Sequence, residues 1–415
     1  MIRRNEFRLG FVGADRGDTN LSWLKEGLDA LGVFLINPLL YVGCLYAIYL
    51  GYIRVKRERK HFHVRVQDGW YETRTYLTKG LMTGLVLSLV LFVAGIMVPL
   101  AFFITVTFVT LLLSLFARPV LLSPAYTWTL SFFLLMAIVY FRMDVPIFAD
   151  YFHGLPGAIL PAAAVITALL VIGEGWLIHR YASRHTSPKI IRSKRGLGAG
   201  VHEVKRLWLV PVLCLIPEGA LSLPIPYWPI FSIGEVSFSL FLFPALIGFG
   251  QEIHYTLPEK GVKRTGKQVM VLGMVSLLVA LGAYWFELLA ILSSLFMLIG
   301  RIVISWNGRR LNRQNPLYFL KNRPGIVVVD VIPGSPAAKM GIQMGEIIKS
   351  VNGVLVHNDT EFYEALHINR AFCKLEVIDR NGENRFVQQA LYEGEHHELG
   401  ILFVASKEQW QSDAG

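Results

Sequence analysis

The sequence predicts a polytopic α-helical membrane protein with about eight or nine transmembrane helices, followed by a small α+β domain. Three observations lead to this fold class. The 38 residues of 80–117 contain no charged side chain. Hydrophobic residues make up 53% of the chain and charged residues 17%, whereas a typical soluble domain carries about 25% charged residues. Charged and turn-forming residues return together only in about the last hundred positions, which predicts a soluble domain there.

The first 30 residues form a basic, polar segment that is expected to lie outside the bilayer core. Residues 1–20 lack the apolar core and the small-residue cleavage site of a signal peptide. Residues 21–30 are compatible with an amphipathic helix that lies along the membrane surface. The transmembrane helical block is then expected over residues 31–304.

Two apolar stretches are each too long for one crossing. As a single helix, residues 80–117 would measure about 57 Å, against a hydrocarbon core of about 30 Å. A turn near Val98-Pro99 is predicted, because proline withholds a backbone donor and crowds the preceding helical turn. Residues 268–304 are expected to break at the aromatic segment 284–287. Single crossings are predicted for residues 31–53, 122–141, 155–178, 208–223 and 229–250.

Lys and Arg in short loops predict which side of the membrane each loop faces, because these residues resist translocation. They gather in four segments, at residues 54–79, 180–206, 260–267 and 309–323. These segments, and the soluble domain after them, are therefore expected on the cytoplasmic side of the cell membrane. Nine crossings would leave the N-terminus outside, whereas the four arginines of residues 1–20 favour the inside, and the two arguments conflict.

Four carboxylates interrupt the apolar stretches: Glu174, Glu218, Glu235 and Glu287. A charged side chain near the bilayer centre costs about 2.5–3.5 kcal/mol on insertion scales, so each one needs an explanation. One interpretation is an ion or proton path, which would make the chain a transporter or channel-like protein. The other, which we favour, places the carboxylates at helix ends or in hydrogen bonds within the bundle, with local breaks at 173–175 and 217–219.

The sequence carries no motif for catalysis, and we expect no enzymatic activity, metal or cofactor. An intramembrane metalloprotease needs two histidines four residues apart on one helix face, with a glutamate between them. His202-Glu203 and His397-Glu398 both lack the second histidine, and no Gly-x-Ser-x-Gly elbow is present. The net charge of +10 comes from Lys and Arg beside apolar stretches, where they orient helices and meet anionic lipid, so no nucleic-acid partner is expected.

From about residue 315 the pattern changes to short strands and turns. Asn352-Gly353 is a strong signal for a two-residue hairpin turn. Asn358, with Glu361 three residues later, forms a capping box that opens a helix over residues 359–370. Strands are predicted at residues 326–331, 346–351, 372–379 and 385–392.

The order of Gly334-Ser-Pro-Ala-Ala338, Gly341-Ile342 and the segment 345–353 resembles a PDZ domain of the bacterial kind. The resemblance implies a groove that holds a peptide as an added strand, its terminal carboxylate bound by a Φ-Gly-Φ loop. The match to that loop lies at the far end of the domain, which implies a permuted strand order. The candidate groove residues are Leu399, Gly400, Ile401, Phe403, Tyr363, Leu366 and His367. Ordinary packing in the core is the alternative interpretation of each.

A multi-span block followed by one terminal PDZ domain resembles the MinJ family of division-topology proteins in Firmicutes. The predicted boundaries are a linker at 305–320, the PDZ domain at 321–405 and a polar tail at 406–415. The resemblance implies a non-enzymatic adaptor at poles and septa that links DivIVA to the MinC–MinD inhibitor of FtsZ assembly. Other division membrane proteins, the lipid bilayer and a second copy of the chain are further expected partners. A PDZ-regulated transporter that uses the intramembrane glutamates and an intramembrane protease remain the alternatives.

Overall fold

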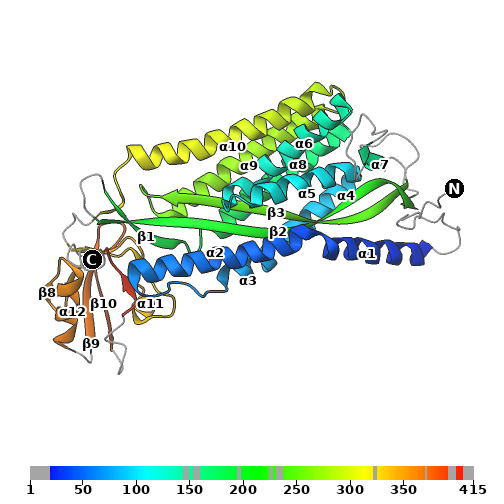
Figure 1. The fold of residues 1–415 in the computed structure, drawn as a ribbon. Coiled ribbons are helices and arrows are strands. Elements are labelled where there is room, and N and C mark those ends of the chain that lie inside the picture. The colour runs from blue at the N-terminus through cyan, green and yellow to red at the C-terminus, as the bar shows by residue number, and fades with distance from the viewer. Residues whose placement is uncertain are drawn as a thin grey trace, which may run out of the picture.

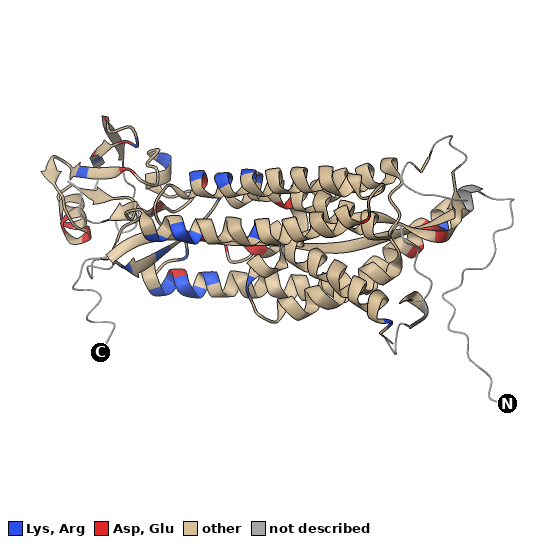
Figure 2. Ribbon diagram, turned by 90° about the horizontal axis from the view of Figure 1, so that it is seen from above, with Lys and Arg blue, Asp and Glu red and all other residues tan. Residues whose placement is uncertain are grey.

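The computed structural model describes residues 19–143, 149–152, 159–193, 198–223, 228–229, 237–320, 325–369, 372–390 and 399–404. The molecule is elongated, with a helical block along most of its length and the C-terminal domain at one end (Figure 1). We call that end the domain end and the opposite end the distal end. Lys and Arg gather along the helices toward the domain end, while most of the remaining helical length is uncharged (Figure 2).

Among the described residues, the helical block contains eight helices of 14 or more residues and several short ones. Its helices are α1 (Thr19–Ile36), α2 (Pro38–Phe62), α3 (Tyr71–Thr78), α4 (Leu81–Ala94), α5 (Leu100–Ser114), η1 (Pro119–Leu122), α6 (Pro124–Phe141), α7 (Ala149–Phe152), α8 (Ile159–Leu177), the π-helical η2 (Ile178–Ala182), α9 (Pro258–Gly282) and α10 (Leu288–Gln314). Among the described residues, six helical segments are long and apolar enough to cross a membrane, and α5 is a shorter apolar helix. The six are Pro38–Phe62, Tyr71–Ala94, Pro124–Phe141, Ile159–Ala182, Pro258–Gly282 and Leu288–Gln314.

The two predicted turns inside long apolar stretches are confirmed. α4 ends at Ala94 and is capped by Gly95, which has a φ of 65°, and α5 begins directly after Pro99. α9 and α10 are likewise separated by residues 283–287. The predicted single helix over residues 31–53 is wrong, because Asn37 ends α1 and caps α2, its Oδ1 accepting from the Leu39 N–H at 3.0 Å.

Two other predicted transmembrane helices are also wrong. Residues 208–222 of the first stretch lie in β2 (Gly198–Ser222), and residues 237–250 of the second lie in β3 (Ser237–Ile253). The two strands pair antiparallel and run through the helical block as a long ribbon, which we call the β2–β3 ribbon (Figure 1). Both faces of the ribbon are largely buried, so its sequence lacks the apolar–polar alternation that distinguishes a strand from a helix. In the described part of the chain, the number of helices that could cross a membrane is therefore smaller than the predicted eight or nine.

The prolines of these stretches explain why they are not helical. Pro211 and Pro244 lie opposite each other in the ribbon, and proline inside a helix removes a hydrogen bond and clashes with the preceding turn. Along most of its length the ribbon has only two strands, so each proline sits on an outer edge, where a missing N–H is tolerated. At the domain end β1 (Ser187–Arg192) pairs with β2, and β4 (Phe319–Leu320) also pairs with β2.

Helices cover the outer edges of the β2–β3 ribbon. Open strand edges are not tolerated in hydrocarbon, because their N–H and C=O groups would lack partners. On the β2 side, the Ser88 hydroxyl of α4 accepts from the Leu213 N–H at 2.8 Å, and the Val98 N–H donates to the Leu215 carbonyl at 2.9 Å. On the β3 side, the buried carboxylate of Glu26 accepts from a backbone N–H of the strand. Backbone groups on both outer edges of the ribbon thus have hydrogen-bond partners in the neighbouring segments.

The C-terminal domain contains a mixed set of short strands and two helices. Its elements are β5 (Ile326–Val327), β6 (Asp330–Val331), α11 (Pro336–Lys339), β7 (Ile347–Val351), β8 (Val354–Leu355), α12 (Asp359–His367), β9 (Phe372–Ile378), β10 (Asn384–Ala390) and β11 (Ile401–Leu402). The main sheet has the order β10-β9-β7-β5, with β8 beside β7, and β11 pairs with β6. The predicted turn at Asn352-Gly353 and the Asn358 cap, which accepts from the Glu361 N–H at 2.8 Å, are confirmed.

Candidate functional site

The last strand of the C-terminal domain is fixed by backbone hydrogen bonds to residues near its start. The Gly400 carbonyl accepts from the Ile332 N–H at 2.8 Å, and the Leu399 carbonyl accepts from the Ala337 N–H at 3.0 Å. Gly400 has a φ of 76°, a left-handed conformation that glycine adopts without strain. A Cβ atom at this position would overlap the side chain of Ser335, which caps α11. Glycine is therefore required here by the domain itself, apart from any role toward a ligand.

Helix α12 packs beside this strand. The rings of Phe362 and Phe403 meet edge to face with centroids 4.9 Å apart. Leu366 and Leu399 are buried in the same hydrophobic cluster, and Tyr363 packs against it. All seven predicted groove residues therefore lie on two adjacent elements, β11 with its flanking residues and α12.

These seven residues differ in what a ligand could reach. Five are buried: Leu399, Gly400, Ile401, Phe403 and Leu366. Tyr363 is half-buried and His367 is exposed. Ile368, which the sequence analysis did not select, follows them at the end of α12 and is 70% exposed. The side chains that a bound peptide can contact are therefore on α12, while the strand offers mainly its backbone.

The C-terminal domain is held against the helical block through a continuous interface. The His202 imidazole on β2 lies 3.1 Å from the Val329 carbonyl through Nε2 and 2.9 Å from the Thr186 hydroxyl through Nδ1. The Tyr318 N–H donates to the His254 carbonyl at 2.8 Å. Burial lowers the pKa of His202 to about 4, so this imidazole is neutral near pH 7. Two apolar clusters complete the contact, and they include Leu257, Phe319, Val327, Ile347, Ile190, Val329 and Val404.

Comparisons with known proteins agree with this architecture. Residues 327–380 match the family model of the PDZ domain. The chain is 38% identical over 386 residues to the "Cell division topological determinant MinJ" of Bacillus subtilis (strain 168), covering 93% of this chain and 96% of that protein. The chain belongs to the MinJ family. It is also 25% identical over 385 residues to each "Probable cell division topological determinant MinJ" of Lacticaseibacillus paracasei and Lacticaseibacillus casei (strain BD-II), covering 89% of this chain and 96% of each.

In this MinJ-family chain, the buried carboxylate of Glu174 has a cationic partner. Glu174 of α8 is fully buried and pairs with Arg301 of α10, with Nη2 and Oε1 2.9 Å apart. Ser123 donates to the other carboxylate oxygen at 2.5 Å, and Arg301 donates to Ser305 at 2.9 Å. The pair joins α6, α8 and α10, and it supports the interpretation of Glu174 as a residue hydrogen-bonded within the bundle. Arg301 was not predicted, although it is the one charged residue between Glu287 and Arg309.

The other three carboxylates have different surroundings. Glu218 lies on β2 with a φ of 65°, where the strand register shifts. The chain is therefore irregular at the predicted break of 217–219, but within a strand and not a helix. The predicted break at 173–175 is wrong, because α8 continues through these residues. Glu287 is exposed in the turn before α10. Glu235 lies outside the described residues.

A second buried ionic cluster, at the domain end, was missed because its members lie in two segments predicted as loops, 54–79 and 180–206. Arg54 of α2 pairs with Glu72 of α3 at 2.7 Å and with Glu58 at 3.1 Å. Arg206 of β2 also reaches Glu72 at 3.3 Å, and the Ser187 hydroxyl donates to Glu58 at 2.7 Å. The cluster ties α2, α3, β1 and β2 together where the C-terminal domain is attached. Among the described residues, no group of three or more His, Cys, Asp and Glu side chains is placed to hold a metal ion.

Proposed function

We propose that this chain is a non-enzymatic, multi-pass membrane adaptor for division-site selection, enriched at septa and poles. In this proposal it links DivIVA to the MinC–MinD inhibitor through protein–protein contacts. The observation that carries the proposal is the 38% identity to a cell division topological determinant over 93% of the chain. Because that similarity spans both the helical block and the PDZ domain, it supports a shared role for the whole molecule and not for one module.

The charge distribution supports a cytoplasmic PDZ domain. Lys and Arg gather toward the domain end of the helical block (Figure 2), and such residues are retained on the cytoplasmic side of bacterial membranes. The six long helices, α5 and the two long strands make nine described segments that run along the block (Figure 1). An odd number supports opposite sides for the two ends of the chain, and α1 begins at the distal end (Figure 1).

The geometry of the PDZ domain supports a permuted groove between β11 and α12. In this mode a peptide adds as a strand beside β11, and side chains of α12 contact the peptide's side chains. Val404, at the end of the strand, packs near Ile190 and Phe62 of the helical block. A peptide running antiparallel to β11 would therefore leave the groove close to the membrane-embedded part. That direction favours a ligand tail from a protein that is itself held at the membrane surface.

The groove is tested in the full-length chain with paired substitutions on α12. Tyr363→Ala with His367→Ala removes the two accessible candidate side chains, and Thr360→Ala with Glu364→Ala changes two neighbours on the same helix. We expect the first pair to weaken copurification of at least one of DivIVA and MinD by about tenfold, and the second pair to leave both unchanged. Septal localisation of the fluorescently tagged chain is scored in parallel. If the first pair retains every partner, the groove is not the docking site.

A further inference from the structure

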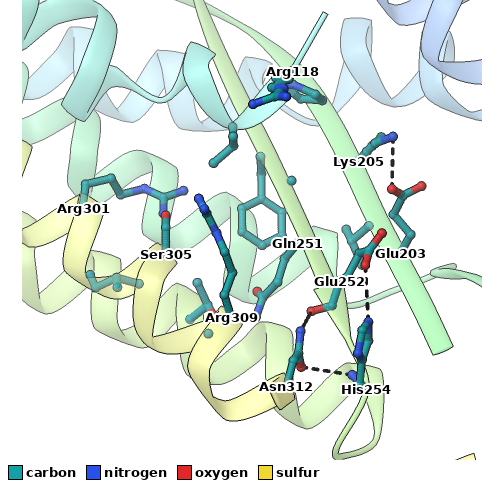
Figure 3. A pocket seen from close by; sticks show the side chains of 18 of the residues that line it. Arg118, Glu203, Lys205, Gln251, Glu252, His254, Arg301, Ser305, Arg309 and Asn312 are labelled. Atoms are coloured by element: carbon teal, nitrogen blue, oxygen red, sulfur yellow. Dashed lines mark hydrogen bonds and ion pairs between the residues drawn. The ribbon is translucent and has the colours of Figure 1, made fainter. Parts of the chain in front are cut away.

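A cavity of about 470 Å³ lies between η1, the β2–β3 ribbon and α10 (Figure 3). Four lining residues follow one face of α10 at intervals of four: Arg301, Ser305, Arg309 and Arg313. Arg118, just before η1, and Lys205 of β2 line the same cavity from its other sides. Figure 3 shows Arg309 reaching from α10 toward the segment that carries Arg118. The wall is thus strongly cationic on more than one element.

The carboxylates in this wall are already neutralised. Glu252 pairs with Lys189 at 2.9 Å and lies 3.3 Å from the His254 imidazole. Glu203 pairs with Lys205 at 3.1 Å and also with Arg57. Within the described part of the chain, by contrast, the guanidinium groups of three lining residues have no carboxylate partner. These are Arg118, Arg309 and Arg313. The cavity therefore carries a net positive charge with nothing in the described protein to balance it.

The cavity lies at the level where the lipid-facing surface ends. On α10 the exposed apolar residues continue to Val303 and are followed by exposed Trp306 and then Arg309. Directly after α5 the exposed apolar residues continue to Phe116, two residues before Arg118. Tryptophan followed by basic residues marks the boundary between hydrocarbon and headgroups. Arg118 and Arg309 are themselves exposed, so the cavity reaches the surface at this boundary.

The remaining wall is suited to the apolar part of a lipid. Val120, Phe249 and Ile304 line the cavity beside the arginines. The carboxamide of Gln251 also lies in the wall, with a buried oxygen that has no hydrogen-bond partner among the described residues. Arginine recognises phosphate through paired N–H donors, and basic pockets between membrane helices on this side bind anionic headgroups. We propose that the cavity binds the phosphate of an anionic phospholipid of the adjacent leaflet, with its apolar portion against Val120 and Ile304.

Retention of lipid by the purified full-length chain tests this site. The chain in detergent is mixed with phosphatidylglycerol or with phosphatidylcholine, and bound lipid is counted by native mass spectrometry. The wild-type chain should retain more phosphatidylglycerol than phosphatidylcholine. Arg118→Gln with Arg309→Gln should lower that retention by about fivefold for each arginine, whereas Arg118→Lys with Arg309→Lys should restore most of it.

Arg264→Gln with Arg310→Gln is the matched control, since both arginines lie outside the cavity and Arg310 packs over the Trp306 ring. It should retain phosphatidylglycerol like the wild type. The proposal is overturned if the cavity pair loses no more lipid than this control. It is also overturned if inorganic phosphate displaces phosphatidylglycerol at the same arginines, because the site then binds free phosphate. Since Arg118 and Arg309 are exposed, unchanged elution on size exclusion is expected for every variant.

Discussion

At the scale of single residues, the carboxyl of Asp330 in the PDZ domain has a strongly shifted pKa. Its Oδ1 accepts from the Val331 N–H at 2.9 Å, and its side chain lines a cavity between the domain and the helical block. Burial raises the pKa of Asp330 to about 7, with the Glu58 carboxylate adding to the effect. The folded chain therefore binds a proton at this position more tightly than the unfolded chain does, for which the carboxyl ionises near its usual 3.8.

This shift has a defined sign for stability. A raised carboxyl pKa contributes stability that is complete below about pH 3.8 and is lost as the pH rises through about 7. We predict that Asp330→Asn raises the thermal unfolding midpoint of the full-length chain by a few degrees at pH 8. The gain should shrink as the pH is lowered from 7 toward 4. Midpoints of wild type and variant, measured by fluorescence in the same detergent across this range, check the prediction.

Asp379 provides a control, because the pKa of its carboxyl is shifted in the opposite direction from that of Asp330. This half-buried residue accepts backbone N–H bonds from Glu383 and Asn381, which lower the pKa of its carboxyl. Asp379→Asn should therefore not raise the midpoint at pH 8. Equal effects of the two substitutions would argue against a special environment for Asp330.

At the scale of secondary-structure elements, the β2–β3 ribbon depends on small residues in the helix that covers it. Gly80, Gly84 and Ser88 recur every four residues, from the start of α4 along one face. A Cβ atom at Gly80 or Gly84 would overlap a backbone carbonyl of β2, so the helix and the strand touch main chain to main chain. Small residues permit the same close approach between membrane helices.

We predict that Gly84→Val destabilises the chain strongly, since overpacking of a tight contact costs about 1–3 kcal/mol. Gly32→Val is the matched control, because Gly32 lies in α1, where an added Cβ atom would meet no described neighbour within 4 Å. The measurements are the yield of folded protein and its thermal midpoint in detergent. A loss of the same size in both variants would contradict the direct contact between α4 and β2.

At the scale of the whole molecule, the PDZ domain is docked at the end where the ionic cluster of Arg54, Glu58, Glu72 and Arg206 joins helices to strands. That arrangement holds the proposed peptide groove at a fixed distance from the membrane surface. A partner bound in the groove would therefore be positioned by the helical block and not by a free linker. The proposal requires the domain end to face the cytoplasm and the distal end to face outward.

Single cysteines test this topology. In a background without Cys44, Cys214 and Cys373, cysteine is placed at Lys25 of α1, at Glu287 before α10, or at Asn381 in the PDZ domain, all exposed positions. In intact cells a membrane-impermeant maleimide should label positions 25 and 287 but not 381. Lysis should expose position 381 to the reagent. Labelling of position 381 in intact cells would place the PDZ domain outside and exclude cytoplasmic recruitment.

Features that depend on neighbouring residues could be predicted from the amino-acid order. An uncharged stretch longer than the bilayer is thick must turn, and the prolines and aromatic residues showed where it turns, near Pro99 and at 284–287. The turn at Asn352-Gly353 and the cap at Asn358 follow from backbone preferences of those residues alone. The PDZ signature is likewise a local pattern of glycines and apolar residues, and the structure builds a domain of short strands and two helices on it.

Features that depend on distant residues emerged only when the elements were seen packed together. Hydropathy cannot distinguish a strand that is buried on both faces from a helix. The β2–β3 ribbon was therefore identified only in the tertiary structure, where α4 packs along it. Glu174 and Arg301 are 127 positions apart, and their pairing required α8 and α10 to lie side by side. Likewise, burial of Leu366 and Phe403 left Tyr363 and His367 as the accessible candidates. The physical reason is the same in each case: these outcomes are set by which surfaces exclude lipid and water, and that is fixed only when the elements pack.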